Sequence, residues 1–583
     1  MNHTKRWKRR AGTFAFVVVM AGCSGGGTAS EPLVQEFPPG WRYPQADSPL
    51  SAAHGMVVST DSLASAAGLS MLQAGGNAVD AAVATGFTLA VVNPEAGNIG
   101  GGGFLVARMA DDTRVALDYR EKAPLAATAD MYLDADGRVT DAGVLGHLAS
   151  GVPGSVAGME AAWSRFGTLP WADLLEPAIR LARDGFVIAP RHLSSVGARA
   201  ELLLRFPSTA AVFLPGGEPP QIGSVFRQPD LARALQSIAD EGAAAFYAGW
   251  IADSTVAEMD RGGGLITHED LASYDAVWRD PVVLDYRGHE VITMPPPSSG
   301  GVTMGQILNI VESFDLASMG WLSADHVHVA VEGMRRAYAD RNYFLGDPDF
   351  VEIPMGRLLS QAYADSLAGT IDMRLASDSR AFNRVPEEST QTTHYSIVDR
   401  EGNAVAVTTT INSWFGSKVV VRGAGYLLNN EMDDFTSKPG VPNQFGLVQG
   451  EANAIAPGKR MLSAMTPTIV VGPEGRTELV TGTPGGATII TTIFQAVTNH
   501  VDFGLPVRAS VDAPRFHHQH LPDLLRYEPS GLPPAIVQEL QRRGHVLEER
   551  TGISGDVQSI HVLEDGTLLG AADRRRGGQA LGY

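Results

Sequence analysis

The chain has a single cysteine, Cys23, among its 583 residues, so it cannot form an intramolecular disulfide bond in any redox compartment. It is also short of positive charge. Its 45 lysine and arginine residues stand against 64 aspartate and glutamate residues, giving a formal net charge of −19. A protein that binds nucleic acid needs a basic face for the phosphates, so this balance argues against nucleic acid as a partner. With 44% hydrophobic residues, the chain can bury a large core.

The extreme N-terminus has the pattern of a targeting segment. Five basic residues between Lys5 and Arg10 precede an apolar run at 12–20, which is too short to span a bilayer as a mature helix. Met20-Ala21-Gly22-Cys23 then resembles a bacterial lipobox, in which the cysteine is lipidated and becomes the first residue. An ordinary secretory signal that is cleaved nearby, with Cys23 incidental, is the alternative interpretation.

The sequence therefore predicts a lipoprotein-type signal peptide over 1–22 and a flexible tether over 23–52, which begins with a glycine- and serine-rich stretch. We expect a periplasmic or cell-envelope location. The lipid at Cys23 is the only expected membrane attachment, because no later apolar run reaches spanning length without a break.

The remainder of the chain has a helical first part and a strand-rich last part. Asp61 is a candidate N-cap for the first helix, and most of 155–373 is expected to be helical. The tract after Thr392 is rich in β-branched residues. We expect two strand layers between helix layers, with helices over 79–91, 324–345, 488–500 and 534–543.

A hairpin with an unusual start follows a polar linker at 379–391. The linker composition is typical of an exposed, mobile segment, and the residues after it alternate as two strands. Asp399 and Asn403 flank a three-residue loop that ends in Gly402, where a left-handed residue is wanted. A hairpin centred on this loop places Thr392 directly opposite Thr410, close enough for the two side chains to interact.

A threonine at the start of a strand can act as a nucleophile if it becomes an N-terminus. Its hydroxyl needs a base, and the free α-amine of the same residue, with an ordinary pKa near neutrality, can be that base. Cleavage of the Gln391–Thr392 bond would create this amine. A threonine-rich surface hairpin without chemistry is the alternative that the hairpin alone leaves open.

Several long motifs resemble the γ-glutamyltransferase (γ-glutamyl transpeptidase, glutathione hydrolase) family, in the family's order, from about Ala53 to Tyr583. The motif around Thr392 resembles the family's signature at its catalytic threonine. The other matching segments are 93–104, 117–121, 295–301, 428–435, 481–486 and 513–518.

The resemblance implies an α/β (α+β) protein with the N-terminal-nucleophile hydrolase fold, a four-layer αββα sandwich formed by two autoproteolytic fragments. These would be a large subunit, 53–391, and a small subunit, 392–583, held together as a heterodimer. It also implies an enzyme that cleaves the γ-glutamyl amide of compounds such as glutathione and transfers the acyl group to water or to an amino acid or peptide. No cofactor or metal is expected.

The site residues follow from the matching motifs. Thr392 is the expected nucleophile, with Thr410 beside it, and Gly485 and Gly486 match the backbone donors of the oxyanion hole, where a close approach to developing charge favours glycine. The substrate's α-carboxylate and α-ammonium need a cation with hydroxyls and a set of carboxylates, respectively. The residues that match these roles are Arg120 and Ser463 for the carboxylate, and Asn412, Glu431 and Asp434 for the ammonium.

Two positions depart from the family pattern. Ala464 stands where many relatives have a second serine, which removes a hydroxyl from the carboxylate clamp. Phe445 stands in the loop that resembles the family's lid, where a tyrosine is common, so a hydrogen bond through that hydroxyl is impossible. Neither change touches the nucleophile.

Three histidines, His517, His518 and His520, suggest a metal site at first sight. Adjacent histidines point apart on any regular element, and no carboxylate or cysteine set completes a site. We expect them to be buried or hydrogen-bonded structural residues.

Two other functions compete with the γ-glutamyl enzyme. A related amidase, such as a glutaryl or cephalosporin acylase, could use the same scaffold. A glutaryl group has no α-amine, however, and would leave Asp434 and Glu431 without a partner. A catalytically dead lipoprotein kept as a binding protein is the third candidate, and the presence of Thr392, Thr410 and the glycine pair argues against it.

Overall fold

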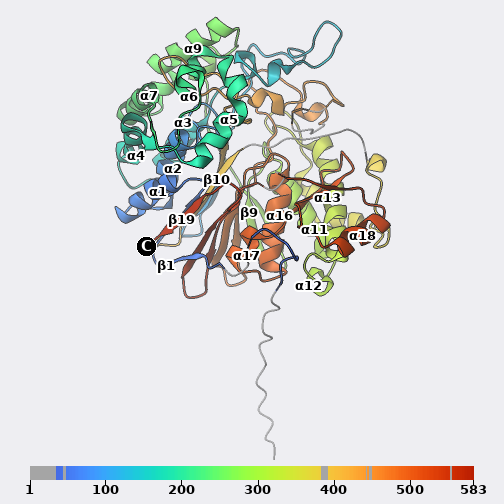
Figure 1. Cartoon of the computed structure of the whole chain (residues 1–583). Helices are drawn as coiled ribbons and strands as arrows, with labels where there is room; N and C mark the ends of the chain where they lie inside the picture. Colours follow the sequence, from blue (N-terminus) through green and yellow to red (C-terminus); the bar gives the residue numbers. More distant parts are fainter. Residues whose placement is uncertain (1–34, 44–46, 383–391, 442, 445–448, 552–554) are drawn as a thin grey trace, which may run out of the picture. The chain divides into compact units, whose positions relative to one another are not determined.

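The computed structural model describes residues 35–43, 47–382, 392–441, 443–444, 449–551 and 555–583 (Figure 1). Three residues singled out by the sequence lie outside this part: Gln391 of the expected cleavage site, Cys23 and Phe445. Within the described residues, no helix combines the length and the apolar character needed to cross a bilayer.

Two seven-stranded antiparallel sheets form the centre of the fold. The first sheet has the strand order β19 (Gln579–Gly582), β2 (Met56–Ser59), β10 (Thr393–Val398), β11 (Ala404–Thr410), β3 (Gly102–Arg108), β4 (Arg114–Asp118) and β7 (Val277–Arg279). The second has the order β1 (Leu50–Ala52), β18 (Leu568–Ala572), β17 (Gln558–Val562), β13 (Thr477–Gly482), β12 (Thr468–Val471), β9 (His289–Thr293) and β8 (Val282–Tyr286). Two small sheets lie outside them, with strands β14 (Phe516–His517), β15 (Leu525–Tyr527) and β16 (Leu547–Glu549), and β5 (Phe186–Val187) and β6 (Val225–Phe226).

Helices cover the outer faces of both sheets (Figure 1). The first group packs on the sheet that holds β10 and comprises α1 (Ser62–Gln73), α2 (Ala78–Val92), α3 (Ser155–Phe166), α4 (Trp171–Asp184), α5 (Pro190–Leu204), α6 (Pro207–Phe213), α7 (Pro229–Glu241), α8 (Ala244–Tyr247), α9 (Trp250–Gly262) and α10 (His268–Ala272). The other helices are α11 (Gly300–Glu312), α12 (Leu316–Met319), α13 (Ala324–Phe344), α14 (Met355–Leu358), α15 (Gln361–Ala368), α16 (Thr488–Val501), α17 (Val507–Asp512) and α18 (Pro534–Arg542). Of these, α11, α13 and α16 share a core with the second sheet.

Strand alternation divides the apolar side chains of the first sheet between two cores. Val405 and Val407 of β11 pack with the first helix group, whereas Ala404 and Ala406 of the same strand pack toward the second sheet. Successive side chains of a strand point to opposite faces, so a strand between two apolar layers is apolar throughout. The layers therefore run helix, sheet, sheet, helix, as the sequence predicts.

The ordered fold begins earlier than the sequence suggested. Leu50–Ala52, which the sequence analysis placed in a flexible tether, forms β1 and pairs with β18. Trp41 is also buried, and its indole Nε1 donates to the carbonyl oxygen of Asp512 at 2.9 Å. The tether boundary at residue 52 is therefore too late, because this segment finds apolar burial and a sheet edge that its composition does not reveal.

The helix starts follow from their caps. The Asp61 side chain accepts a hydrogen bond from the backbone N–H of Leu63 and so begins α1. Asn77 and Asp80 form a capping box at the start of α2. The expected helices at 324–345, 488–500 and 534–543 are present as α13, α16 and α18, with bounds within about two residues. The middle of the chain is less uniformly helical than expected, since β7, β8 and β9 lie within it.

Candidate active site

The hairpin of β10 and β11 has the register that the sequence predicts. Thr393 pairs with Thr409 and His394 with Thr408, so Thr392, the residue before β10, stands level with Thr410. Gly402 closes the loop with φ of 87°, and the Asp399 side chain accepts hydrogen bonds from the N–H groups of Glu401 and Asn403. Thr392 and Thr410 are 4% and 3% exposed, so both hydroxyls lie in a protected site.

A glycine run packs directly beneath Thr410. The Asn98 amide donates to the carbonyl oxygen of Thr410 at 2.8 Å. A Cβ atom at Gly101 would clash with that same carbonyl oxygen, and one at Gly103 would lie 2.5 Å from the carbonyl oxygen of Thr408. These glycines allow the backbone that leads into β3 to approach β11 closely.

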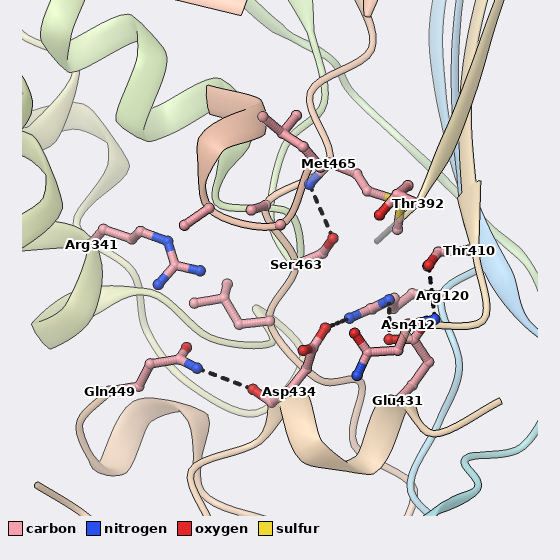
Figure 2. Close-up of a pocket in the computed structure, with 15 residues that line it drawn as sticks. Arg120, Arg341, Thr392, Thr410, Asn412, Glu431, Asp434, Gln449, Ser463 and Met465 are labelled. Atoms are coloured by element: carbon pink, nitrogen blue, oxygen red, sulfur yellow. Dashed lines mark hydrogen bonds and ion pairs between the residues drawn. The ribbon is translucent and has the colours of Figure 1, made fainter. Parts of the chain in front are cut away.

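One pocket brings together nearly all the site residues that the sequence singled out (Figure 2). It lies at the end of the hairpin, and Gly485, next to Gly486, is the one described candidate that does not line it. The candidate residues in its lining are Arg120, Thr392, Thr410, Asn412, Glu431, Asp434, Ser463 and Gly486.

Arg120 is one of two cations that line this pocket, the other being Arg341, and three carboxylates surround Arg120. Its guanidinium forms an ion pair with Glu431 at 3.0 Å and a short one with Asp434 (Figure 2). It forms a third ion pair, with Glu121, at 3.4 Å. The Arg120 side chain is 1% exposed, and those of Glu121 and Glu431 are fully buried. When ionised, these three carboxylates outnumber the two buried cations, Arg120 and Arg341, which favours an additional positive group in the pocket.

Burial raises the pKa values of these carboxyl groups. The pKa of Glu121 is raised to about 8, because desolvation outweighs the attraction of Arg120. The pKa of Asp433, the neighbour of Asp434, is also raised to about 8 by burial and then by the charge of Asp434. Burial likewise raises the pKa of Glu431 and of Asp434 above their usual ranges. The cluster therefore holds protons near neutral pH until a cation enters.

Asn412 and Asp434 are fixed by backbone contacts. Asn412 adopts φ of 69°, its N–H donates to the Thr410 hydroxyl at 2.8 Å, and its amide donates to the carbonyl oxygen of Asn430 at 2.9 Å. Asp434 ends the short 3₁₀ helix η5 (Glu431–Asp434), and its carbonyl oxygen accepts a hydrogen bond from the Gln449 side chain at 3.1 Å (Figure 2).

Ser463 is held by the loop that precedes α11. The N–H of Ser463 donates to the carbonyl oxygen of Pro297 at 2.8 Å, and its own carbonyl oxygen accepts from the N–H and the hydroxyl of Ser299 at 2.7 and 2.6 Å. The Ser463 hydroxyl accepts from the N–H of Met465 at 3.1 Å (Figure 2). Ala464 also lines the pocket, so the missing hydroxyl at this position is missing from the site itself.

Arg341 is a site residue that the sequence reasoning missed. It comes from α13 and lines the same pocket (Figure 2). Its Nε donates to the Ser299 hydroxyl at 2.9 Å, and this hydroxyl in turn donates to the carbonyl oxygen of Ser463. The sequence gives little indication that Arg341 lines a site, because an arginine near the end of a long helix is usually a solvated residue of the last turn. Here it is 1% exposed.

The two glycines after Pro484 have backbone conformations that favour glycine. Their φ angles are 145° for Gly485 and 58° for Gly486, and a Cβ atom at Gly485 would lie 2.6 Å from the Thr488 hydroxyl. Helix α16 begins at Thr488, immediately after them. Gly486, Ala487 and Ile489 line the pocket, so the positive end of this helix faces it, an arrangement that stabilises an anion.

The three histidines are hydrogen-bonded within the fold. His517 contacts the Thr491 hydroxyl at 2.8 Å, His518 contacts Asp523 at 3.2 Å, and His520 contacts the carbonyl oxygen of Ser379 at 2.9 Å. All three are at most 2% exposed. Each ring thus has a structural partner, and the described residues contain no cluster of three or more histidine, cysteine or carboxylate side chains placed to hold a metal ion.

Comparisons with known proteins agree with this geometry. The gamma-glutamyltranspeptidase family model matches residues 64–583. The chain is 49% identical over 534 residues to the glutathione hydrolase proenzyme of Escherichia coli (strain K12), covering 90% of this chain and 91% of that protein. It is 41% identical over 537 residues to the acylase ACY 1 proenzyme of Pseudomonas sp. (strain SE83), covering 91% and 94%. The crystal structure of cephalosporin acylase from Bacillus halodurans superposes with a TM-score of 0.83 at 30% identity, covering 94% of this chain and 99% of that one.

The two antiparallel sheets with their helical layers are the architecture of the N-terminal-nucleophile hydrolases. The chain belongs to the gamma-glutamyltranspeptidase family of enzymes.

Proposed function

We propose that this protein is a self-processing γ-glutamyltransferase and glutathione hydrolase, made as a proenzyme and matured by cleavage between Gln391 and Thr392. The observation that carries the proposal is the shared pocket of Thr392, Thr410 and Arg120, with its surplus of buried carboxylates. The 49% identity to a glutathione hydrolase proenzyme supports the substrate.

The donor's α-amino acid end matches the pocket in charge. Its α-carboxylate would pair with Arg120 and with the hydroxyl of Ser463, both of which line the pocket. Its α-ammonium would be bound by Asn412, Glu431 and Asp434. The ammonium would supply positive charge to the buried carboxylates. Charge balance therefore favours the same placement of the donor as the individual contacts do, with its carboxylate at Arg120 and its ammonium at Glu431 and Asp434.

Acyl transfer would begin with the neutral α-amine of Thr392, which takes the proton from the hydroxyl of the same residue. The hydroxyl oxygen attacks the γ-carbonyl carbon, and the developing oxyanion is stabilised by the backbone N–H groups at Gly485 and Gly486 and by the start of α16. The C–N bond then breaks, and the leaving amine receives the proton. Water, or the amine of an amino acid or peptide, next attacks the γ-glutamyl-Thr392 ester and releases the product.

Maturation would use the same hydroxyl and the same oxyanion donors, but not the α-amine of Thr392, which is still part of the peptide bond. The Thr392 hydroxyl attacks the carbonyl carbon of Gln391, the peptide bond to the Thr392 nitrogen breaks, the hydroxyl proton passes to that nitrogen, and an ester forms. Hydrolysis of this ester leaves a carboxylate on Gln391 and a free α-amine on Thr392. The fragment that ends at Gln391 and the fragment 392–583 would remain a heterodimer, because β10 and β11 of the small fragment lie between β2 and β3 of the large one.

A glutaryl or cephalosporin acylase is the second candidate, supported by the superposition on a cephalosporin acylase and by 41% identity to an acylase proenzyme. The carboxylates around Arg120 weigh against it, since a glutaryl group carries no ammonium for them. The 41% identity to the acylase proenzyme is also lower than the 49% identity to the glutathione hydrolase proenzyme, which favours the γ-glutamyl enzyme. A catalytically dead lipoprotein is disfavoured by the paired threonines in a protected pocket.

The proposed location is the periplasm or the cell envelope, with the mature chain held by a lipid on Cys23. The lipobox-like sequence at 20–23 supports this proposal.

Purified protein incubated with glutathione tests the function, with glutaryl-7-aminocephalosporanic acid as the competing donor. We expect release of glutamate from glutathione, γ-glutamyl transfer to an added amino acid, and little release of glutarate. Release of glutarate without release of glutamate would identify the acylase instead. Activity on neither donor, in correctly cleaved protein, would contradict both candidates.

A further inference from the structure

Asp556 is a buried carboxylate near the nucleophile that the proposed mechanism does not use. It lies two residues before β17 and is fully buried. Its Oδ2 accepts a hydrogen bond from the Thr60 hydroxyl at 2.9 Å. Among the described residues its Oδ1 has no hydrogen-bond partner. A fully buried carboxylate is costly unless it is paired, so its presence here calls for a role.

The side chain of Asp556 fixes the direction of a short hydrogen-bond chain. The Thr60 and Thr393 hydroxyls lie 2.9 Å apart. When Asp556 is ionised, the single hydroxyl proton of Thr60 is donated to it, so the Thr60 oxygen accepts the proton of Thr393. The chain therefore runs from Thr393 through Thr60 to the carboxylate. Its first member is the residue that follows the nucleophile Thr392.

The backbone of Asp556 contacts the loop that carries the proposed oxyanion donors, Gly485 and Gly486. The Asp556 N–H donates to the Thr483 hydroxyl at 2.8 Å, and Thr483 lies two residues before Gly485. Gly555 has φ of 66°, and a Cβ atom there would clash with Thr483 and with the carbonyl oxygen of Pro484. The segment at 555–556 is therefore packed directly against the loop that precedes the two glycines.

Arg576 completes the arrangement from the C-terminal end of the chain. Its Nη1 donates to the carbonyl oxygen of Thr392 at 3.4 Å. Burial, and then the charge of Asp573, raise the pKa of Asp556 to about 7, although Arg576, the hydrogen bond from Thr60 and Arg515 each act to lower it. Arg576 thus favours the ionised carboxylate and also contacts the nucleophile residue itself.

Maturation makes this support necessary. Cleavage after Gln391 would turn Thr392 into a chain end, and chain ends fray unless they are held. A nucleophile must nevertheless stay within about half an ångström of its productive position. Arg576 contacts the carbonyl oxygen of Thr392, and the hydrogen bonds through Thr60 to Asp556 hold Thr393. Both contacts add to the strand pairing of β10.

We propose that Asp556 is a positioning residue that couples the nucleophile strand to the oxyanion loop. Through its side chain and Thr60 it holds Thr393, and through its backbone it holds Thr483. It acts on Thr392 and on Gly485 and Gly486 without touching the substrate. Its loss should therefore slow the chemical step and leave donor binding nearly unchanged.

Steady-state kinetics on Asp556→Ala, Asp556→Asn and Thr60→Val test this role, with kcat expressed per mole of chain that carries a Thr392 N-terminus by mass spectrometry. Loss of a hydrogen bond of this kind should lower kcat about tenfold in Asp556→Ala and in Thr60→Val, with KM for the donor within about twofold of wild type. Asp556→Asn keeps an oxygen that accepts the Thr60 proton, so it should retain at least about half of the wild-type kcat.

Thr255→Val is the matched control for Thr60→Val. Thr255 is a buried threonine of α9 whose hydroxyl contacts the Tyr426 hydroxyl at 2.5 Å, far from this chain of hydrogen bonds in sequence and outside the pocket. We expect its kcat to equal that of wild type. If Asp556→Ala is not cleaved at all, restored cleavage in Asp556→Asn supports the same positioning role, because cleavage uses the same nucleophile.

Wild-type kcat in both Asp556→Ala and Thr60→Val would overturn the inference. So would an Asp556→Asn variant as slow as Asp556→Ala, or a loss confined to KM. The inference rests on the proposed function, and the two fail separately. Inactive wild-type protein contradicts the function, whereas active wild type with unaffected variants contradicts only the role of Asp556.

Discussion

Thr393 of β10 pairs directly with Thr409 of β11, and this register sets the Thr392 side chain level with that of Thr410. The pairing depends on the three-residue loop closed by Gly402 and on the side-chain hydrogen bonds of Asp399. A slip of one residue would turn one of the two hydroxyls away from the pocket. The proposed chemistry of Thr392 therefore rests on the geometry of a hairpin whose loop lies outside the pocket.

Thr410 gives the first prediction. Its hydroxyl accepts the N–H of Asn412 at 2.8 Å and shares the pocket with Thr392. We expect Thr410→Val to lower kcat by about tenfold or more and to slow self-cleavage. The substitution removes a hydroxyl beside Thr392 and leaves the N–H of Asn412 without its acceptor. Thr410→Ser keeps the hydroxyl and should stay within about threefold of wild type. Equal activity of the valine and serine variants would show that the Thr410 hydroxyl has no part in catalysis.

Ala464 gives the second. A hydroxyl donated to a charged carboxylate contributes about 1.5–3 kcal/mol when it is well aligned. The α-carboxylate is remote from the breaking bond, so the contact should act equally in the ground and transition states and appear in KM. We expect Ala464→Ser to lower KM for a chromogenic γ-glutamyl donor by several-fold to about tenfold, with kcat nearly unchanged. Ala464→Gly adds no hydroxyl and serves as the control. An unchanged KM in the serine variant would mean that position 464 makes no contact with the carboxylate.

The carboxylates around Arg120 predict a proton release on binding. A carboxyl group with a raised pKa holds a proton below that pKa, and burial raises the pKa of Glu121 to about 8. The incoming α-ammonium favours the ionised carboxylates and lowers their pKa values, so glutamate binding at pH 7 should release protons, and affinity should rise as the pH increases toward 8. Calorimetry of glutamate binding in two buffers with different ionisation enthalpies measures the number released. The Glu431→Gln variant should release fewer protons than wild type when it binds glutamate. Proton uptake by wild type would contradict the assignment of this cluster to the ammonium.

Cys23 predicts the location of the protein. If this cysteine carries lipid, the wild-type protein should partition with membranes and into detergent, and Cys23→Ala should be released or remain unprocessed. Fractionation of cells that express both proteins, with mass spectrometry of the N-terminus, is the measurement. Wild-type protein that is free in the periplasm or the medium, with an N-terminus at another residue, would exclude the anchor.

The hairpin and several helix starts could be predicted from sequence because each rests on a local pattern. The loop at 399–403 fixes the register, and Asp61 marks the start of the first helix by capping chemistry that acts within one helical turn. The gathering of Arg120, Glu431 and Ser463 in one pocket was accessible only through the family resemblance, since residues so far apart in the chain share no local signal.

Long-range partners explain what the sequence did not reveal. Arg341 looks like an ordinary helix-end arginine until its contact with Ser299 and its burial are seen. Leu50–Ala52 lacks a strong strand pattern and becomes β1 only because β18 offers an edge more than 500 residues away. Asp556 belongs to none of the matching motifs, and its link to Thr393 exists only through Thr60.

The measurement that tests the account most directly is the N-terminal sequence of the smaller fragment, by mass spectrometry of purified active protein, together with the same measurement on Thr392→Ala. We expect two fragments in the wild type, with Thr392 as the first residue of the smaller one, and we expect Thr392→Ala to be a single uncleaved chain that releases no glutamate from glutathione. Full activity in an uncleaved wild-type chain, or glutamate release by Thr392→Ala, would contradict the assignment of Thr392 as the nucleophile.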